Sequence, residues 1–228
     1  MGNLYLVRHG QASFGATDYD NLSALGQRQS KRLGEYFKGK GLQFDAVLTG
    51  TLKRHAQTWG GIAQGMATEG QAERTMQALL WPGLNEYDSE AVVRAIHPAP
   101  LERPDSPEGY KHHFRLLRDG LTQWMNGVVS PTGMPSYPDF VQGVSSALDH
   151  VRQHCSGNVL IVSSGGPIAT ALGRVLGTTP ETTIELNMRI RNSAVSELMF
   201  TPKRHVLLTF NTLPHLDAAE YASWITYA

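Results

Sequence analysis

Leu4-Tyr5-Leu6-Val7-Arg8-His9-Gly10-Gln11, near the start of this 228-residue sequence, is its most informative segment for the fold. A continuous apolar run that ends in Arg8, His9 and Gly10 predicts a strand buried on both faces of a parallel sheet. Ligands of open α/β sheets bind beyond the carboxyl ends of such strands. An arginine and a histidine at that point could hold an anion and attack it. The plainer alternative is a buried strand that merely ends in two polar residues.

Two further strand–helix junctions carry polar residues in the same position. A strand expected at 44–49 is followed by the segment 50–54, and a strand at 159–163 is followed by Ser164-Gly165-Gly166-Pro167. We expect the three segments to converge, because the carboxyl ends of parallel strands lie at one edge of the sheet. The third segment also opens a helix, whose free N–H groups and dipole favour an anion. Arg8 and Arg54 would add charged hydrogen bonds. The three segments together therefore predict a binding site for a phosphate-sized anion.

The order of the expected elements predicts an α/β fold. Two strand–helix units are followed by an insertion, a helix at 137–154, the strand at 159–163 and another helix. This order is typical of a three-layer sandwich, with a mostly parallel sheet and helices on both faces. Alternating residues at 193–200 and 204–210 predict a late strand pair that includes an antiparallel strand. The other elements are expected at about 24–38 (helix), 52–66 (helix) and 74–80 (short strand).

The segment 89–135 differs from the rest of the chain, which we otherwise interpret as a single domain of residues 1–228. It is rich in proline, shows helical stretches near 89–97 and 109–127, and has no strand pattern. We interpret it as a helical cap insertion that covers the site. Tyr110, Phe114 and Trp124 lie on spacings that suit helix packing, so we expect them in a core. The cap and the loop at 11–21 are expected to select the substrate, which the sequence does not identify.

The composition argues against several classes of protein. The chain has 20 Lys and Arg against 20 Asp and Glu, which argues against nucleic-acid and membrane partners. Its single cysteine, Cys155, cannot form an intramolecular disulfide, and no signal peptide is recognisable, so we expect a cytoplasmic protein. The histidines show no metal-ligand spacing, so we expect no metal site. The oligomeric state is open, and a homodimer is one alternative.

The segment around His9 resembles the signature of the histidine phosphatase superfamily, which has the phosphoglycerate mutase-like fold. Further segments resemble the family's motifs in the same order, over about residues 4–200. The resemblance implies a metal-independent phosphomonoesterase, without a cofactor, that acts on a small-molecule phosphoester or a phosphoprotein. The further segments are Leu22-Ser23-Ala24-Leu25-Gly26-Gln27-Arg28-Gln29, Thr51-Leu52-Lys53-Arg54-His55-Ala56-Gln57-Thr58, Leu84-Asn85-Glu86, Val162-Ser163-Ser164-Gly165-Gly166 and Asn192-Ser193-Ala194-Val195.

The resemblance also implies roles for individual residues. His9 would be the nucleophile and would form a phosphohistidine. It must be neutral to attack, and two nearby arginines should favour the neutral form. Arg8 and Arg54 would bind the phosphoryl oxygens and stabilise charge during transfer. Glu86 would protonate the leaving oxygen and then take a proton from the attacking water.

Two departures from the family's pattern leave alternatives open. Ser164 stands where the family has its second histidine. Its hydroxyl can bind phosphate beside the backbone of Gly165, but it carries no charge. Losing a charged hydrogen bond costs roughly 1.5–3 kcal/mol, or about 10- to 100-fold in rate. The main alternative is therefore a phosphate-binding or regulatory protein with little turnover. A phosphoglycerate mutase is less favoured, because Gly15 and Glu86-Tyr87-Asp88 depart from the mutase pattern.

Overall fold

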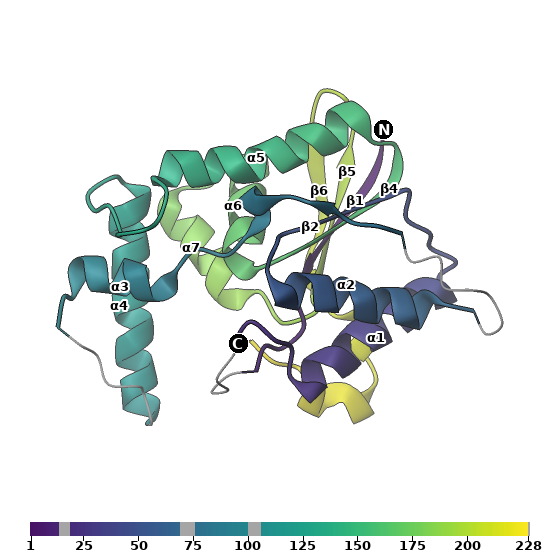
Figure 1. Ribbon diagram of the computed structural model, residues 1–228, viewed down its shortest axis with the longest axis horizontal. Helices are drawn as coiled ribbons and strands as arrows, with labels where there is room; N and C mark the ends of the chain where they lie inside the picture. The colour runs from purple at the N-terminus through teal and green to yellow at the C-terminus, as the bar shows by residue number, and fades with distance from the viewer. Residues whose placement is uncertain (14–18, 69–75, 100–105, 228) are drawn as a thin grey trace.

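The computed structural model describes residues 1–13, 19–68, 76–99 and 106–227. Its centre is a six-stranded sheet (Figure 1). The strands are β1 (Gly2–Arg8), β2 (Ala46–Thr49), β3 (Leu79–Leu80), β4 (Gly157–Ser163), β5 (Val195–Phe200) and β6 (His205–Thr212). Their order is β3-β2-β4-β1-β5-β6, so the apolar strand that opens the chain lies in the interior of the sheet.

β5 is the one strand of this sheet that runs in the opposite direction to the other five. β1 pairs in parallel with β4, β4 with β2, and β2 with β3, whereas β5 is antiparallel to both β1 and β6. The expected mostly parallel sheet with one antiparallel strand near the C-terminus is therefore confirmed. β3 is shorter than the expected strand at 74–80. Because β3 pairs with only the last two residues of β2, the described residues 76–78 are left outside the ladder, and 74–75 lie outside the described residues.

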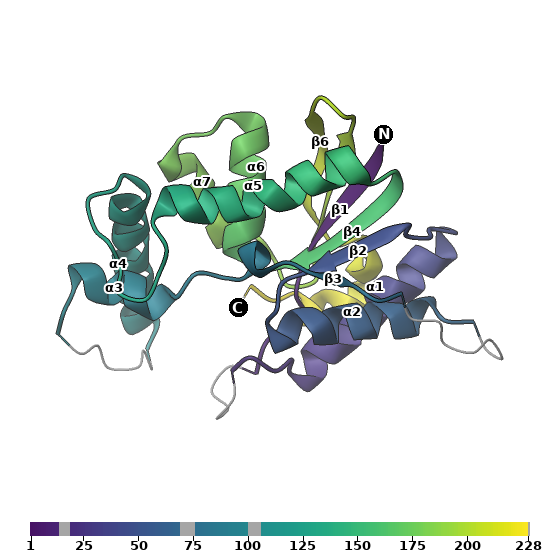
Figure 2. The same cartoon turned by 45° about the horizontal axis from the view of Figure 1, so that its top comes forward.

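Helices cover both faces of the sheet (Figure 2). One layer contains α1 (Ala24–Gly39) and α2 (Lys53–Met66), and the other contains α5 (Tyr137–His154), α6 (Gly165–Leu176) and α7 (Pro180–Arg189). Leu4 and Leu6 of β1 pack in the core of the second layer, whereas Tyr5 and Val7 pack in the core of the first. This alternation follows the two-residue period of a strand. The expected three-layer sandwich is thus confirmed, although α7 was not expected.

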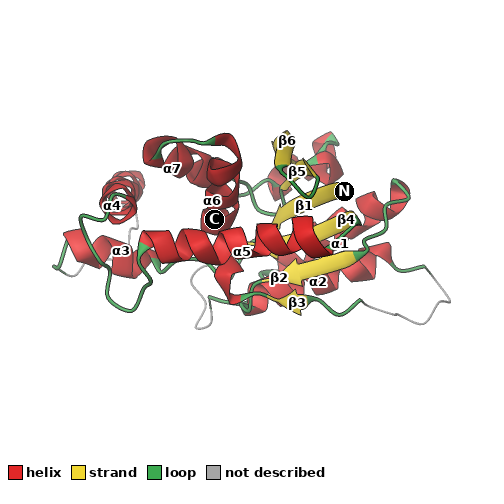
Figure 3. Ribbon diagram, turned by 90° about the horizontal axis from the view of Figure 1, so that it is seen from above, coloured by secondary structure: helices red, strands yellow, loops and turns green. Residues whose placement is uncertain are grey.

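The insertion holds two helices at one end of the molecule, away from the strands (Figure 3). They are α3 (Ser89–Ile96) and α4 (Pro107–Met125). Trp124 is 2% exposed, but Tyr110 and Phe114 are 39% and 43% exposed, so the prediction of a core position was wrong for these two. The buried residues of α4 all lie between Leu117 and Trp124, and its N-terminal half extends beyond the packed part of the cap.

The register of the sheet brings the carboxyl ends of three strands level with one another. Arg8 of β1 pairs with Ser163 of β4, and Thr49 of β2 pairs with Val162. The chain segments that follow β1, β2 and β4 therefore leave the sheet at the same edge. This is the edge at which the sequence placed the three polar segments.

The described ranges contain neither a helix that could span a membrane nor a cluster of metal ligands. In the described ranges, no helix combines the length and apolar character needed to cross a bilayer. The same ranges contain no group of three or more His, Cys, Asp and Glu residues arranged to hold a metal ion. Cys155 follows α5 and is partly exposed as a free thiol.

Candidate active site

His9 lies directly after β1 and is almost completely buried, with 3% of its surface exposed. Its backbone N–H donates to the Ser163 carbonyl at 2.9 Å, and its carbonyl accepts from the Ser193 N–H at 3.2 Å. The ring Nδ1 lies 2.7 Å from the carbonyl oxygen of Gly10. Because a carbonyl can only accept, Nδ1 carries the proton and Nε2 keeps its lone pair.

The surroundings of His9 keep its ring neutral. Burial lowers the pKa of His9 well below its ordinary value, and the charges of Arg8 and Arg54 and the ring of His55 lower it further. The sequence interpretation attributed a neutral His9 to the arginines, whereas the loss of hydration is the larger cause. A neutral imidazole with its proton fixed on Nδ1 presents Nε2 as a nucleophile.

Arg8 and Arg54 lie beside this histidine with part of each guanidinium unpartnered. Nη1 of Arg8 donates to the carbonyl oxygens of Ile190 and Tyr227, at 2.5 Å each. Nη1 of Arg54 donates to Asp20 at 2.8 Å. The Nε atoms of both arginines are buried and have no hydrogen-bond partner among the described residues. Buried donors of this kind are rare in folded proteins, and an anion bound between the two arginines would satisfy them.

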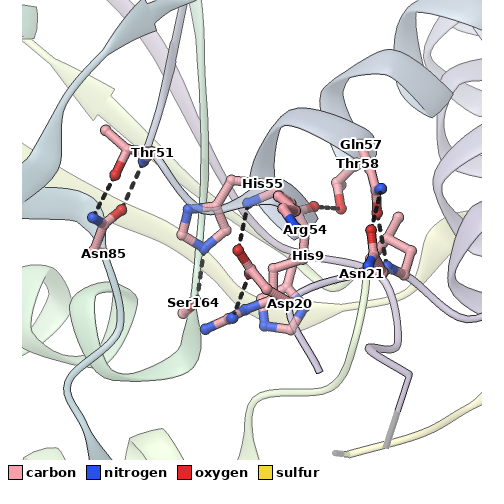
Figure 4. A network of polar contacts seen from close by, with 12 residues as sticks. His9, Asp20, Asn21, Thr51, Arg54, His55, Gln57, Thr58, Asn85 and Ser164 are labelled. Atoms are coloured by element: carbon pink, nitrogen blue, oxygen red, sulfur yellow. Dashed lines mark hydrogen bonds and ion pairs between the residues drawn. The ribbon is translucent and has the colours of Figure 1, made fainter. Parts of the chain in front are cut away.

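Asp20 is a residue of the site that the sequence interpretation missed. Its Oδ1 accepts from Arg54 and its Oδ2 accepts from the Lys53 N–H, each at 2.8 Å (Figure 4). The neighbouring Tyr19 ring lies over the Arg54 guanidinium, with 5.7 Å between its centroid and Cζ. The loop before α1 therefore reaches the arginine that was expected to bind phosphate. A loop carboxylate gives no sequence signal of this contact, because its partner is 34 residues away.

Glu86 follows the short 3-10 helix η1 (Pro82–Leu84) and meets the N-terminus of α6. The Gly166 N–H lies 3.1 Å from Oε1 and 3.2 Å from Oε2 of the carboxyl group. Burial raises the pKa of Glu86, although the Gly166 hydrogen bond and the charges of Arg8 and Arg54 oppose the rise. A Cβ atom at Gly166 would lie 2.2 Å from Oε1, so only glycine leaves room for the carboxyl group. A raised pKa favours the protonated form that a general acid needs.

Ser164 occupies the N-cap position of α6, but its side chain does not cap the helix. Its Oγ instead lies 2.7 Å from Nε2 of His55, and both residues are completely buried (Figure 4). The ring centroids of His55 and His9 are 5.8 Å apart. Burial, and then the charge of Arg54, lower the pKa of His55 to about 3. Gly165, which was expected to bind phosphate, follows in the first turn of α6 and is buried.

Polar residues of α2 hold the loops on which the site is built (Figure 4). Thr58 Oγ1 accepts from the Gly10 N–H at 3.1 Å and donates to the Arg54 carbonyl at 2.7 Å. Gln57 Oε1 accepts from the Leu22 N–H at 2.7 Å. Gln57 and Thr58 therefore hold the loop after His9 and the residues that lead into α1.

The structure brings Arg8, His9, Arg54, Glu86 and Ser164 to one edge of the sheet. Fold and site together define an α/β protein in which a neutral histidine lies among two arginines and a buried acid. A sequence model of the histidine phosphatase superfamily (branch 1) matches residues 4–213. The chain therefore belongs to that superfamily, which confirms the family that its motifs indicated. A comparison with curated proteins finds no match.

Solved structures share the fold over nearly the whole chain. A phosphoserine phosphatase from Entamoeba histolytica, in complex with 3-phosphoglyceric acid, is 21% identical with a TM-score of 0.63, over 95% of this chain and 100% of that chain. The protein YhfR from Bacillus stearothermophilus is 18% identical with a TM-score of 0.68, over 94% and 99%. A phosphoglycerate mutase from Bacillus anthracis is 16% identical with a TM-score of 0.62, over 94% of each chain. At these identities the TM-scores establish the shared fold alone, and that fold occurs in both a phosphatase and a mutase.

Proposed function

We propose that this protein is a phosphatase that hydrolyses phosphomonoesters through a phosphohistidine on His9. The observation that carries the proposal is the 2.7 Å contact between His9 Nδ1 and the Gly10 carbonyl. It leaves Nε2 unprotonated in a ring that its surroundings keep neutral. The unpartnered Nε donors of Arg8 and Arg54 support a phosphoryl group beside that nitrogen. The substrate would be a small-molecule phosphoester or a phosphoprotein.

The proposed reaction has two steps. Nε2 of His9 forms a bond to phosphorus while the ester P–O bond breaks, and Glu86 gives its proton to the leaving oxygen. Water then attacks the phosphorus, its proton passes to the Glu86 carboxylate, and the N–P bond breaks. Inorganic phosphate leaves, and both side chains return to their initial protonation states. Arg8 and Arg54 supply the charge stabilisation in both steps, so the scheme uses no metal and no cofactor.

A phosphate-binding protein with little turnover is the second candidate. Two observations favour it. Ser164 brings no charge to the position where the family resemblance expects a histidine, and Asp20 already neutralises part of the Arg54 charge. In this case phosphate and phosphoesters would bind at the same edge of the sheet without being hydrolysed.

Hydrolysis of p-nitrophenyl phosphate between pH 5 and pH 8, in the presence of a chelator, separates the candidates. The proposal predicts turnover that survives the chelator and is lost in His9→Ala. His154→Ala is the matched control, because His154 is an exposed residue at the end of α5. Turnover that persists in His9→Ala, or that requires a metal, would contradict the proposed mechanism. Binding of phosphate without turnover would instead support the second candidate.

A further inference from the structure

His55 and Ser164 form an isolated polar pair beside the candidate nucleophile. Their side chains meet at 2.7 Å, and neither residue has any exposed surface. His55 comes from the first turn of α2 and Ser164 from the N-terminus of α6, 109 residues apart in the chain. The His55 ring also lies 5.8 Å from the His9 ring, centroid to centroid (Figure 4). The pair therefore lies beside the ring of the candidate nucleophile.

The hydrogen bonding of His55 indicates which ring nitrogen carries the proton. Its Nδ1 is buried and has no hydrogen-bond partner among the described residues. An orphaned buried N–H is rarer and more costly than an unpaired buried acceptor, so the proton belongs on Nε2. The low pKa of His55, about 3, leaves the ring with this single proton at neutral pH. Nε2–H then donates to Ser164 Oγ.

A hydroxyl that accepts from His55 keeps its own O–H free to donate. The Ser164 oxygen accepts no capping hydrogen bond from the backbone of α6, and the hydroxyl forms no other hydrogen bond within the described ranges. The first turn of α6 and the side chain of His55 fix the position of the oxygen. This donor is free for a ligand, and the ring of His9 lies 5.8 Å from that of His55, centroid to centroid.

The backbone near His55 is built to leave space for its ring. A Cβ atom at Gly50 would lie 2.3 Å from His55 Nδ1 and 2.6 Å from Asn85 Oδ1. Any side chain at position 50 would therefore crowd the imidazole and the Asn85 amide. The glycine leaves room for the His55 ring at the place where it meets Ser164.

We propose that His55 is a positioning residue that orients the Ser164 hydroxyl to donate a hydrogen bond to the phosphoryl group. In this way the two side chains together do the work expected of a second histidine at position 164. The inference rests on the proposed function, since it assigns a role at the same site. It adds that a histidine from α2 supports the phosphoryl contact made at the start of α6.

A double-mutant cycle on phosphoester hydrolysis tests whether the two residues act as a unit. We expect His55→Ala and Ser164→Ala each to lower kcat by about 10- to 100-fold, because one phosphoryl donor is lost or misdirected. The double variant should be no slower than Ser164→Ala, since His55 acts only through Ser164. Unchanged kcat in His55→Ala, or losses that multiply in the double variant, would overturn the proposal.

A histidine exchange provides the readout that a merely structural role would not produce. Ser164→His alone places a second ring against His55 in a fully buried position, so we expect it to lower kcat. Adding His55→Ala removes the clash, so the double variant should be faster than either single variant. The proposal is contradicted if Ser164→His has the same effect in both backgrounds.

His215→Ala controls for the loss of a buried histidine. His215 Nε2 lies 2.9 Å from Ser193 Oγ, and the ring is 1% exposed with an unpartnered Nδ1, so the pair resembles His55 and Ser164. His215→Ala should lower stability but lower the kcat of the folded protein less than His55→Ala does, because its partner Ser193 contacts only the backbone of His9. If His215→Ala lowers kcat as much as His55→Ala, a general packing effect explains both losses and the proposal fails.

Lack of turnover in the parent chain would overturn the proposed function. Two further measurements test the role of His55 even in that case. One is binding of inorganic phosphate by calorimetry, which should weaken about tenfold in His55→Ala and not in His215→Ala. The other is ¹⁵N NMR of the histidine rings, which should place the His55 proton on Nε2. Equal phosphate binding by parent and His55→Ala, no binding by the parent, or a proton on Nδ1 would each overturn the inference.

Discussion

The carboxylate of Asp20 forms a 2.8 Å ion pair with Arg54, the arginine that the proposed mechanism uses to bind the phosphoryl group. The Arg54 side chain is 9% exposed and that of Asp20 is 28% exposed. The ion pair fixes the guanidinium before a ligand arrives. It also opposes an incoming anion, because part of the Arg54 charge is already balanced.

Asp20→Asn should therefore strengthen the binding of inorganic phosphate. The amide keeps an oxygen that can accept from Arg54 but removes the negative charge. We expect the inhibition constant for phosphate to fall about fivefold, which corresponds to ~1 kcal/mol of repulsion between partly exposed charges. Asp149→Asn is the control, because Asp149 pairs with Arg152 on the far part of α5. Phosphate inhibition that weakens in Asp20→Asn would show that orientation of Arg54 matters more than its charge balance.

Glu86→Gln should slow hydrolysis most for substrates with poor leaving groups. Glutamine has no proton to give, and an alkoxide needs one more than a nitrophenolate does. We expect kcat to fall at least 10-fold more for an alkyl phosphate than for p-nitrophenyl phosphate. The parent rate should also decline as pH rises through the raised pKa of Glu86, and the decline should disappear in Glu86→Gln. Equal losses for the two substrates would remove Glu86 from the role of general acid.

Gly166→Ala should disable the site while Gly60→Ala leaves it intact. A Cβ atom at Gly166 would lie 2.2 Å from Glu86 Oε1 and 2.5 Å from the Tyr87 ring, so the acid must move. We expect kcat to fall at least 10-fold. Gly60 lies inside α2 with open space at its Cβ position, and its replacement should stabilise the protein by about 0.5–1 kcal/mol. Full activity of Gly166→Ala would indicate that Glu86 is not held as the structure shows.

Stability should fall as pH decreases below about 6.5. Burial lowers the pKa values of His9, His55 and His215, the last two to about 3. Below the unfolded value of 6.5 the unfolded chain therefore binds protons that the folded chain does not. Each histidine lowers the free energy of unfolding by about 1.4 kcal/mol per pH unit in this range. The raised pKa of Glu86 has the opposite sign, but it is one group against three.

Urea unfolding at pH 7 and pH 5 measures this loss. The transition midpoint of the parent should move to lower urea at pH 5. In His215→Gln the shift should be smaller by the contribution of one histidine, because this ring no longer titrates. Equal midpoints at the two pH values would show that the buried histidines are hydrated or protonated in the folded protein.

The sequence predicted the fold well where apolar patterning and chain order determine it. The helix at 137–154 has the expected bounds, because an N-cap serine, a proline in the first turn and a regular apolar face all coincide. The antiparallel β5 follows from the alternation of its residues. α7 was missed because only Thr183 and Ile184 of its residues are buried, which leaves little apolar period. Tyr110 and Phe114 have core-like spacing, but the neighbouring elements do not extend to cover them.

The site was predictable only where a residue directly follows a strand or belongs to a recognisable motif. His9 directly follows β1 and, like Arg8 and Arg54, belongs to a recognisable motif. His55 lies next to Arg54 in the motif but gives no signal by itself, since its partner is Ser164. The available clue was that the sequence lacks a histidine at position 164 and has one at position 55. The contact between Asp20 and Arg54 joins residues that are distant in the sequence, and local sequence patterns do not determine such a contact.

Trapping of the phosphoenzyme without acid shows whether His9 carries the phosphoryl group. The protein would be mixed with a phosphoester, quenched in alkali within milliseconds and digested, and the peptides would be analysed by mass spectrometry and ³¹P NMR. We expect an alkali-stable, acid-labile phosphate on the peptide that contains His9, and none in His9→Ala. Turnover by the parent with no phosphate on His9, or with phosphate on Ser164, would contradict it.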